Sequence, residues 1–357
     1  MKAAQAIFDY LKQHCPAADI RIIDILDKSS FFFKVNYSKG YLFLVKHALF
    51  LWGLSFWITA FKPLRSLTRP IARALNRLNT QPFAQYLIEE QPDYIISTHF
   101  LPPEIAAYLK KKKKINSRLF TVITDFGVHP YWITDPVDIY LVASDFTKAE
   151  LMREGIKENK IKVTGIPVDV KLLQAENKQL LCEKLNIRSD KFTVLVSTGS
   201  FGLGPIEEIV RLLHNDAELL VVCARNEKLR IKLLKLNYPG VKVFGFVDNM
   251  PELMSVSSLM ITKPGGLSIA EILIRELVPL FICPIPGQEM ENVRALEHYG
   301  AGISISSVSA IRDTVLRFKA NPEELEKFKV KIRELKKPQV LEEICNVVCK
   351  NSIGPGC

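Results

Sequence analysis

The sequence predicts an α/β protein made of two doubly wound, parallel-sheet domains that face a ligand cleft. Short continuous runs of Val, Ile and Leu alternate with helical patterns, which is typical of parallel strands covered on both faces. A polar stretch rich in Gln, Asn and Lys follows the turn at residues 163–168, and a second series of strands starts at Thr193. At 357 residues the chain is long enough for two domains with sizeable cores.

We place the domain boundary after Val168, which gives domains of residues 1–168 and 169–357. The expected strands are Ile20–Ile25, Tyr94–Ser97, Leu119–Thr124, Ile139–Ala143, Ile161–Thr164, Thr193–Ser197, Leu219–Val222, Val241–Phe244, Leu259–Thr262 and Leu280–Cys283. Charged helices after about Ser309 complete the second domain, and the last of them is expected to cross back to the first. Ligands of such folds bind outside the carboxyl ends of the strands.

The strongest local motif is a double glycine between a predicted strand and a predicted helix. Residues 263–271 read K-P-G-G-L-S-I-A-E and follow an apolar run directly. Glycines at a helix start let a phosphate approach backbone N–H groups, where the helix dipole favours an anion. The simpler alternative is a tight turn with a capping box formed by Ser268 and Glu271. Both interpretations of Glu271 are open at this point.

A second polar turn follows the next strand. Residues 284–292 read P-I-P-G-Q-E-M-E-N, which presents two amides and two carboxylates after a buried apolar run. A phosphate cradle and a cluster of hydroxyl-binding side chains on neighbouring strand ends together fit a nucleotide-sugar.

Two further loops of the second domain contain candidate ligand groups. Residues 198–205 are rich in glycine but lack the Gly-Lys-Ser/Thr of a P-loop, so only their place after the domain's first strand gives them weight. Arg225 follows the next strand, where it can either bind a phosphate or pair with a neighbouring acid. The sequence does not decide between these roles.

Polar residues after strands of the first domain are candidates for acid–base chemistry. Asp125 and His129 follow one predicted strand, and His99 follows another. A carboxylate or imidazole at that edge can remove a proton from an attacking hydroxyl. Locally, an Asp that caps a turn and a His satisfied by backbone groups explain these residues equally well.

A basic and aromatic segment lies in the first half of the chain. Residues 28–78 contain nine Lys and Arg and no Asp or Glu, and eleven aromatic residues fall within residues 31–61. Tyr41–Phe61 is long enough to span a bilayer, but Lys46 would be costly in hydrocarbon. We favour binding in the membrane interface through the aromatic residues and an arginine stripe, over a span or a buried helix pair with a solvated basic face. The residues expected to meet the membrane or its lipid are Trp52, Trp57, Arg65, Arg69 and Trp132.

Several motifs together resemble glycosyltransferase family 28, and within it the diacylglycerol glycosyltransferases. They are G-F-V-D-N-M-P-E-L-M at 245–254, K-P-G-G-L-S-x-x-E at 263–271, P-I-P-G-Q-E-x-x-N at 284–292 and T-D-F-x-x-H-x-x-W at 124–132. Residues 223–226 resemble the family's C-G-R-N pattern, with Ala224 in place of the glycine. The resemblance implies the GT-B architecture and inverting transfer of a hexose from UDP-glucose or UDP-galactose to diacylglycerol at the membrane surface.

The resemblance also implies roles for individual residues. Glu271 holds the ribose, Phe246 and Val247 flank the uracil, and Gln288, Glu289 and Asn292 bind the sugar. The full set expected at the donor is Gly199, Ser200, Gly202, Arg225, Phe246, Val247, Gly265, Gly266, Ser268, Glu271, Gln288, Glu289 and Asn292. The residues expected to act in catalysis are Asp125, His129 and His99.

The chain departs from the family at its beginning. Family members open with a strand and a Gly-x-Gly-His loop ahead of a helix like residues 2–7, where this chain starts. We expect either that the protein's start lies upstream or that this form is a fragment of doubtful activity. Two other functions stay open: transfer of N-acetylglucosamine to a lipid-linked cell-wall precursor, and an inactive, membrane-associated nucleotide-binding module.

Cofactor and partner expectations follow from what the sequence contains. No Asp-x-Asp holds a divalent ion against a diphosphate, so we expect no cofactor and no metal requirement. Cys345 and Cys349 share one helix face, but no neighbouring His or Cys in the sequence makes them a metal site. Expected partners are the UDP-sugar, diacylglycerol and anionic membrane lipids, and no nucleic acid. With no secretory signal at Met1, we expect a cytoplasmic protein associated peripherally with a membrane.

Overall fold

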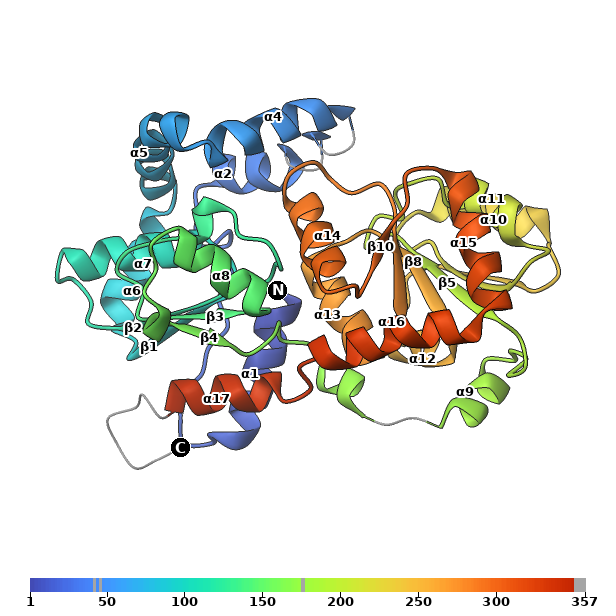
Figure 1. Cartoon of the computed structure of the whole chain (residues 1–357). Helices are drawn as coiled ribbons and strands as arrows, with labels where there is room; N and C mark the ends of the chain where they lie inside the picture. Colours follow the sequence, from blue (N-terminus) through green and yellow to red (C-terminus); the bar gives the residue numbers. More distant parts are fainter. Residues whose placement is uncertain (41–42, 45–46, 175–176, 350–357) are drawn as a thin grey trace. The chain divides into compact units, whose positions relative to one another are not determined.

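The computed structural model describes residues 1–40, 43–44, 47–174 and 177–349, and its ribbon is drawn in Figure 1. The chain divides into two compact units: unit 1 comprises residues 1–169, 285–291 and 339–357, and unit 2 comprises residues 170–284 and 292–338. The chain first leaves unit 1 for unit 2 after Asp169, which is one residue after the expected boundary. The last helix belongs to unit 1.

Unit 1 is a parallel sheet with helices on both faces. Its strands are β1 (Tyr94–Ser97), β2 (Arg118–Val122), β3 (Ile139–Val142) and β4 (Ile161–Val163), in the order β1-β2-β3-β4. Its helices are α1 (Lys2–His14), α2 (Phe31–Val35), the π-helix η1 (Asn36–Gly40), α4 (Leu49–Ala60), α5 (Lys62–Asn79), α6 (Gln81–Glu90), α7 (Leu101–Lys111), η2 (Pro130–Trp132), α8 (Asp145–Arg153), η3 (Glu158–Lys160) and α17 (Val340–Cys349).

Alternate residues of the unit 1 strands face opposite layers, as the pleat of a strand requires. Phe120 and Val122 of β2 lie in a core cluster with α1 and α17. Leu119, directly before Phe120, packs with α6 and α7 on the other face. Both faces of the sheet are therefore covered, which explains the continuous apolar runs of its strands.

The expected strand Ile20–Ile25 is not formed. Residues 19–24 have no regular secondary structure, and the chain turns at Asp24, whose carboxylate accepts a hydrogen bond from the Leu26 N–H at 2.9 Å. Arg21 extends instead toward Asp19 and Glu90. Ile25 is still buried, so the apolar pattern here reflects packing rather than sheet pairing.

Unit 2 is a larger parallel sheet with helices on both sides. Its strands are β5 (Thr193–Ser197), β6 (Glu218–Val222), β7 (Val241–Phe244), β8 (Leu259–Thr262), β9 (Val278–Phe281) and β10 (Ile303–Ser304). Its helices are η4 (Val170–Leu173), α9 (Lys178–Lys184), α10 (Ile206–Leu213), α11 (Glu227–Leu236), α12 (Met250–Val256), α13 (Gly266–Ile274), α14 (Gln288–His298), α15 (Val308–Ala320) and α16 (Pro322–Leu335). The first turn of α14, residues 288–291, counts with unit 1.

The strand order of unit 2 creates a topological switch point. The order is β10-β9-β8-β5-β6-β7, with every adjacent pair parallel. The winding of the chain reverses at the neighbouring strands β5 and β8, where Ser197 pairs with Thr262. Loops that leave two such strands diverge and open a crevice at the carboxyl edge, the usual ligand position in these sheets. Figure 1 shows β5 and β8 side by side in the middle of the sheet.

The structure also bears on the possible membrane span. Among the described residues, no helix combines the length and the apolar character needed to cross a bilayer. Lys46, which counted against a span in the sequence, lies outside the described residues, as do residues 41, 42 and 45.

Candidate functional site

Two loops of unit 2 flank the switch point. Residues 198–205 leave β5, and residues 263–265 leave β8 to start α13 at Gly266. Gly265 is the N-cap of α13 and, because it has no side chain, makes no capping hydrogen bond to this helix end. The N–H groups of its first turn are therefore available to an anion, with the helix dipole behind them. Thr198, buried beside this point, has a hydroxyl with no hydrogen-bond partner among the described residues.

The backbone conformations of Gly199 and Gly202 favour glycine, whereas that of Gly265 suits any residue. Gly202 has φ +54°, and an added Cβ would lie 2.4 Å from the carbonyl oxygen of Cys223. Gly199 has φ +83°. Gly265 instead has φ −72° and ψ 136°, and the nearest atom to an added Cβ would be the Ser268 Oγ at 3.9 Å. The backbone conformation at position 265 does not require glycine. We therefore attribute the absence of a side chain there to the group that approaches the start of the helix.

The capping-box interpretation of Ser268 and Glu271 is wrong. A capping box would place Ser268 at the N-cap, but α13 begins two residues earlier, at Gly266, with Gly265 as its cap. Ser268 is thus the third residue of the helix and Glu271 the sixth. Both side chains are half-buried. The capping box therefore does not explain Glu271, and its implied ribose contact stays a prediction.

The loop after β6 is locked to the loop after β5. Asn226 donates from Nδ2 to the Gly202 carbonyl at 3.0 Å, and its Oδ1 caps α11 by accepting from the Leu229 N–H at 3.1 Å. Ala224 has φ +50°, a conformation that favours glycine. This is the position where the resembled motif has glycine. The neighbouring Arg225 is exposed.

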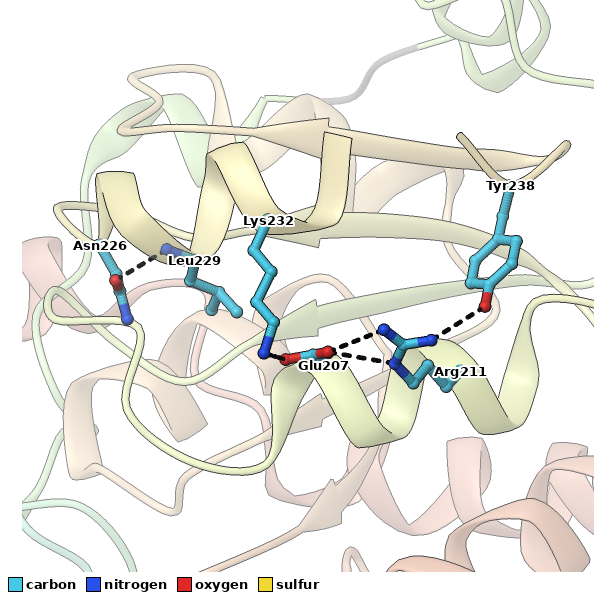
Figure 2. Close-up of polar contacts among 6 residues, drawn as sticks. All are labelled: Glu207, Arg211, Asn226, Leu229, Lys232 and Tyr238. Atoms are coloured by element: carbon cyan, nitrogen blue, oxygen red, sulfur yellow. Dashed lines mark hydrogen bonds and ion pairs between the residues drawn. The ribbon is translucent and has the colours of Figure 1, made fainter. Parts of the chain in front are cut away.

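Figure 2 shows the polar cluster behind this loop. Glu207 of α10 pairs with Arg211 at 3.0 Å and with Lys232 at 2.5 Å, and Arg211 reaches the Tyr238 hydroxyl at 3.4 Å. A surface hollow lined by Gly204, Pro205, Glu207, Glu208, Arg211 and Leu229 adjoins these groups. Because the charges satisfy one another, we interpret the cluster as support for the loop rather than as a ligand site.

Three further residues predicted to bind the donor differ in how far their side chains are exposed: Phe246, Val247 and Asn292. Phe246, after β7, is 69% exposed, so its ring can receive a planar base, and Val247 beside it is half-buried. Asn292 is fully buried and donates from Nδ2 to the Pro264 carbonyl at 3.0 Å. The expected direct sugar contact of Asn292 is corrected: its amide holds the turn ahead of Gly265 in place.

The turn before α14 packs within unit 1. An added Cβ at Gly287 would lie 2.4 Å from the Phe56 ring, so α4 and this turn are in close contact. Gln288 Nε2 lies 2.9 Å from both carboxylate oxygens of Asp125 and donates to them. Glu289 accepts from the Ile285 N–H at 2.7 Å. A residue of the predicted sugar set and a candidate base are thus hydrogen-bonded to each other.

Both candidate histidines use both ring nitrogens. His129 Nδ1 accepts from the Tyr131 N–H at 3.2 Å, and its Nε2 lies 3.3 Å from the Thr59 hydroxyl. His99 Nδ1 accepts from the Leu101 N–H at 3.2 Å, and its Nε2 lies 3.2 Å from the Tyr37 hydroxyl. An Nδ1 that accepts carries no proton, so the neutral ring is protonated at Nε2 and donates there.

Burial lowers the pKa of both histidines to about 4. Each imidazole is therefore neutral at neutral pH, with its one lone pair engaged by a backbone N–H. Neither ring offers a lone pair to an incoming hydroxyl in this arrangement. Asp125 is thus the best placed of the three candidate bases.

Trp132 is not at a surface. It is 4% exposed and lies in a core cluster with Ile123, Val137 and Tyr140. The expectation that it meets the membrane or the acceptor is wrong, because the 3₁₀ turn after His129 directs it inward. Of the other tryptophans, Trp57 is 56% exposed and Trp52 is half-buried.

The arginines of α5 face the protein rather than the surroundings. Arg65 pairs with Glu154 at 2.9 Å, with its side chain only 16% exposed, and Arg69 donates to the Ile133 carbonyl. Arg77 lies over the Tyr108 ring. The expectation that an arginine stripe meets the membrane is therefore corrected for Arg65 and Arg69. Sequence periodicity found the stripe but could not tell which face of the helix is inside.

The apolar residues of α5 lie on its outer face. They are 54–70% exposed and recur at helical spacing: Leu67, Ile71, Leu75 and Leu78. Residues of α4 add Phe50 at 78% and Trp57 at 56%. We call these six side chains the apolar face. So large an exposed apolar surface is unusual unless it meets a partner.

One helix connects the apolar face to the candidate base loop. On the inner side of α4, the Phe56 ring lies 4.3 Å from the His129 ring and Thr59 contacts His129 Nε2. No sequence motif marks Thr59 or Phe56, which is why sequence reasoning missed them.

The two parallel-sheet units define a class of fold, the GT-B architecture. Solved structures with the same fold include MurG from Acinetobacter baumannii, with a TM-score of 0.56 and 13% identity over 78% of this chain and 80% of that one. Another is Anabaena Alr3699/HepE in complex with UDP, with a TM-score of 0.52 and 14% identity over 78% of this chain and 84% of that one.

The chain belongs to glycosyltransferase family 28, in its diacylglycerol glycosyltransferase branch. Residues 1–168 match the monogalactosyldiacylglycerol (MGDG) synthase family, and residues 193–343 match the glycosyltransferase family 28 C-terminal domain. It is 32% identical to a processive diacylglycerol beta-glucosyltransferase of Bacillus cereus, over 74% of this chain and 70% of the relative. It is 34% identical to that of Staphylococcus epidermidis, over 72% and 67%.

Proposed function

We propose that the protein transfers a hexose, glucose or galactose, from a UDP-sugar to diacylglycerol at a membrane surface. The observation that carries this proposal is the uncapped N-terminus of α13 at the switch point, behind a Gly265 that the fold itself does not require. The relatives named for diacylglycerol glucosyl transfer support the acceptor. The product is a glycosyldiacylglycerol, and family membership supports inversion at the anomeric carbon.

The donor diphosphate binds at the start of α13. Backbone N–H groups of residues 266–268 and the helix dipole stabilise the charge that develops on the departing UDP. The exposed ring of Phe246 stacks on the uracil, and Glu271 holds the ribose. We propose that this stabilisation needs no divalent cation, because the chain has no Asp-x-Asp for one and the helix start supplies positive potential.

The acceptor is activated in unit 1. Asp125 takes the proton of the diacylglycerol hydroxyl, and the side-chain amide of Gln288 orients its carboxylate. His129 and His99 shape the loop through their backbone and hydroxyl contacts and donate rather than accept at Nε2.

The acceptor comes from the membrane. The apolar face of α4 and α5 inserts into the interface, where apolar side chains leave water. The inward-facing arginines then stabilise the fold, and exposed lysines such as Lys62 attract anionic lipids. This anchoring is peripheral.

A product assay tests the proposal. The purified chain is incubated with diacylglycerol in phosphatidylglycerol-containing vesicles and either UDP-glucose or UDP-galactose, and lipids are analysed by mass spectrometry. We expect a hexosyldiacylglycerol from at least one donor. UDP binding by calorimetry without product from either donor would overturn the enzyme proposal and favour the inactive binding module. Product only with UDP-N-acetylglucosamine and a lipid-linked precursor would overturn the acceptor.

A further inference from the structure

Three cysteines from opposite ends of the chain meet in unit 1. Cys345 and Cys349 lie one turn apart on α17, with their Sγ atoms 3.7 Å apart. Cys15, at the end of α1, places its Sγ 3.8 Å from that of Cys349. All three sulfur atoms lie within 4.8 Å of one another. Cys15 lies 330 or more positions from the α17 pair, so sequence spacing does not mark it as their partner.

The three thiols lie in a sheltered, apolar setting. Cys15 is 5% exposed and belongs to the core cluster that α1 and α17 form with β2 and β3. Cys345 and Cys349 are partly buried against the same cluster. Figure 1 shows α1 and α17 close together in this part of unit 1, and the two helices are in direct contact.

Two helix C-termini converge on the cluster. Cys15 is the C-cap of α1, and Cys349 is the last residue of α17. The C-terminal end of a helix carries partial negative charge, so it disfavours an isolated thiolate and favours a cation. A cation held by the three sulfurs would lie beside both helix ends, where its positive charge is favoured.

We infer that Cys15, Cys345 and Cys349 form a three-thiolate site for a soft divalent cation, with Zn²⁺ as the best fit. Zn–S bonds of about 2.3 Å in a tetrahedron put neighbouring sulfurs about 3.8 Å apart. Two of the three separations here, 3.7 and 3.8 Å, already have this value. The described residues supply three ligands, and water can complete the tetrahedron. Mg²⁺ and Ca²⁺ prefer oxygen ligands and do not fit.

The site would join the first and last helices of unit 1. Metal binding displaces the thiol protons and is coupled to the packing of α1 on α17, so it stabilises the folded chain. None of the residues assigned to the donor, the base or the apolar face belongs to the cluster. The inference is therefore independent of the proposed function.

Metal titration of the full chain tests the inference. The reduced, metal-stripped protein is titrated with Zn²⁺ against a chromophoric chelator, and with Cd²⁺ to follow thiolate-to-metal charge transfer in the ultraviolet. We expect one ion per chain, a higher midpoint of thermal unfolding and a charge-transfer intensity that corresponds to three thiolates. Cys15→Ser and Cys349→Ser should each weaken zinc binding by more than about 100-fold, beyond what changes outside the coordination sphere cost.

Cys283→Ser, at an exposed thiol outside the cluster, is the matched control and should bind zinc as wild type does. If Cys15→Ser fails to fold, Cys345→Ser, at a less buried position, together with the wild-type cadmium spectrum still decides the question. Zinc affinity unchanged in a folded cluster variant would overturn the inference. So would a fully reduced wild-type protein that binds no zinc, or a spectrum of fewer than three thiolates.

Discussion

The side-chain amide of Gln288 donates to both carboxylate oxygens of Asp125, with Nε2 2.9 Å from each. Asp125 lies in the loop after β2, and Gln288 is the first residue of α14. Asp125 is 5% exposed, so this donor offsets part of the cost of burying its carboxylate. A group predicted to bind the sugar therefore also orients the group proposed to deprotonate the acceptor.

Replacing apolar residues on the outer face of α5 should weaken membrane binding. Leu67 and Ile71 are 70% and 64% exposed. Moving each side chain out of water contributes about 1 kcal/mol or more to the free energy of membrane binding. The double variant Leu67→Gln with Ile71→Gln should therefore lower vesicle partitioning about 30-fold. Co-sedimentation with vesicles measures the effect.

Two controls on the same helix separate this account from an electrostatic one. Ser66→Gln changes an exposed polar position and should leave partitioning unchanged. Arg65→Gln should destabilise the fold, because it breaks the pair with Glu154, but should not weaken partitioning of the folded protein. A loss with Arg65→Gln as large as that of the double variant would restore the arginine stripe as the membrane contact.

Gly265→Ala should weaken UDP binding without harming the fold. Its backbone angles suit any residue, and an added Cβ meets nothing closer than 3.9 Å. The methyl group would block approach of the diphosphate to the helix start. Loss of one hydrogen bond to a charged group, about 1.5–3 kcal/mol, raises the dissociation constant for UDP about tenfold or more. Calorimetry measures it.

Gly202→Ala is the matched contrast to this variant. Its φ of +54° and the 2.4 Å approach of the Cys223 carbonyl predict a loss of about 1–3 kcal/mol of stability. If Gly265→Ala bound UDP as wild type does, the diphosphate would not lie at the start of α13.

Ala224→Gly should stabilise unit 2. Ala224 has φ +50°, where an L-residue with a Cβ costs about 1–2 kcal/mol. The greater entropy that glycine loses on folding offsets part of this gain, which leaves about 0.5–1 kcal/mol. Thermal unfolding monitored by calorimetry should show a higher midpoint, whereas a lower one would show that Ala224 is not strained.

Acidification should destabilise the protein through His99 and His129. Both have a folded pKa of about 4, below the ordinary value of 6.5, because of burial. Their contribution to stability is full above pH 6.5. It is lost as the pH falls from 6.5 to 4, because in this range only the unfolded chain binds protons at the two histidines. For two histidines, the free energy of unfolding then falls by up to about 2.7 kcal/mol per pH unit.

The His99→Asn and His129→Asn double variant tests this pH dependence. Its unfolding midpoint should fall less than that of wild type between pH 7.5 and pH 5. Equal falls would mean that other groups account for the acid sensitivity.

The positions of the strand-end loops were predictable because apolar runs and glycines are local signals. Four strands, β1, β5, β7 and β8, have the predicted bounds. A capping box at Ser268 stayed open as an alternative, because the sequence offers two helix starts and only the backbone shows that α13 begins at Gly266. Helical spacing placed the arginines of α5 on one face, yet the inward direction depends on partners far along the chain, such as Glu154. The meeting of Cys15 with α17 is long-range in the same way.

The rate of hexose transfer by Asp125→Asn tests the central claim most directly, that this carboxylate removes the acceptor proton. Removing a general base lowers turnover by about 10²–10⁴-fold, while UDP affinity should stay within about twofold of wild type. His129→Asn should keep kcat within about tenfold, because its ring has no lone pair to offer. Wild-type turnover in Asp125→Asn, or an equal loss in folded His129→Asn, would contradict the claim.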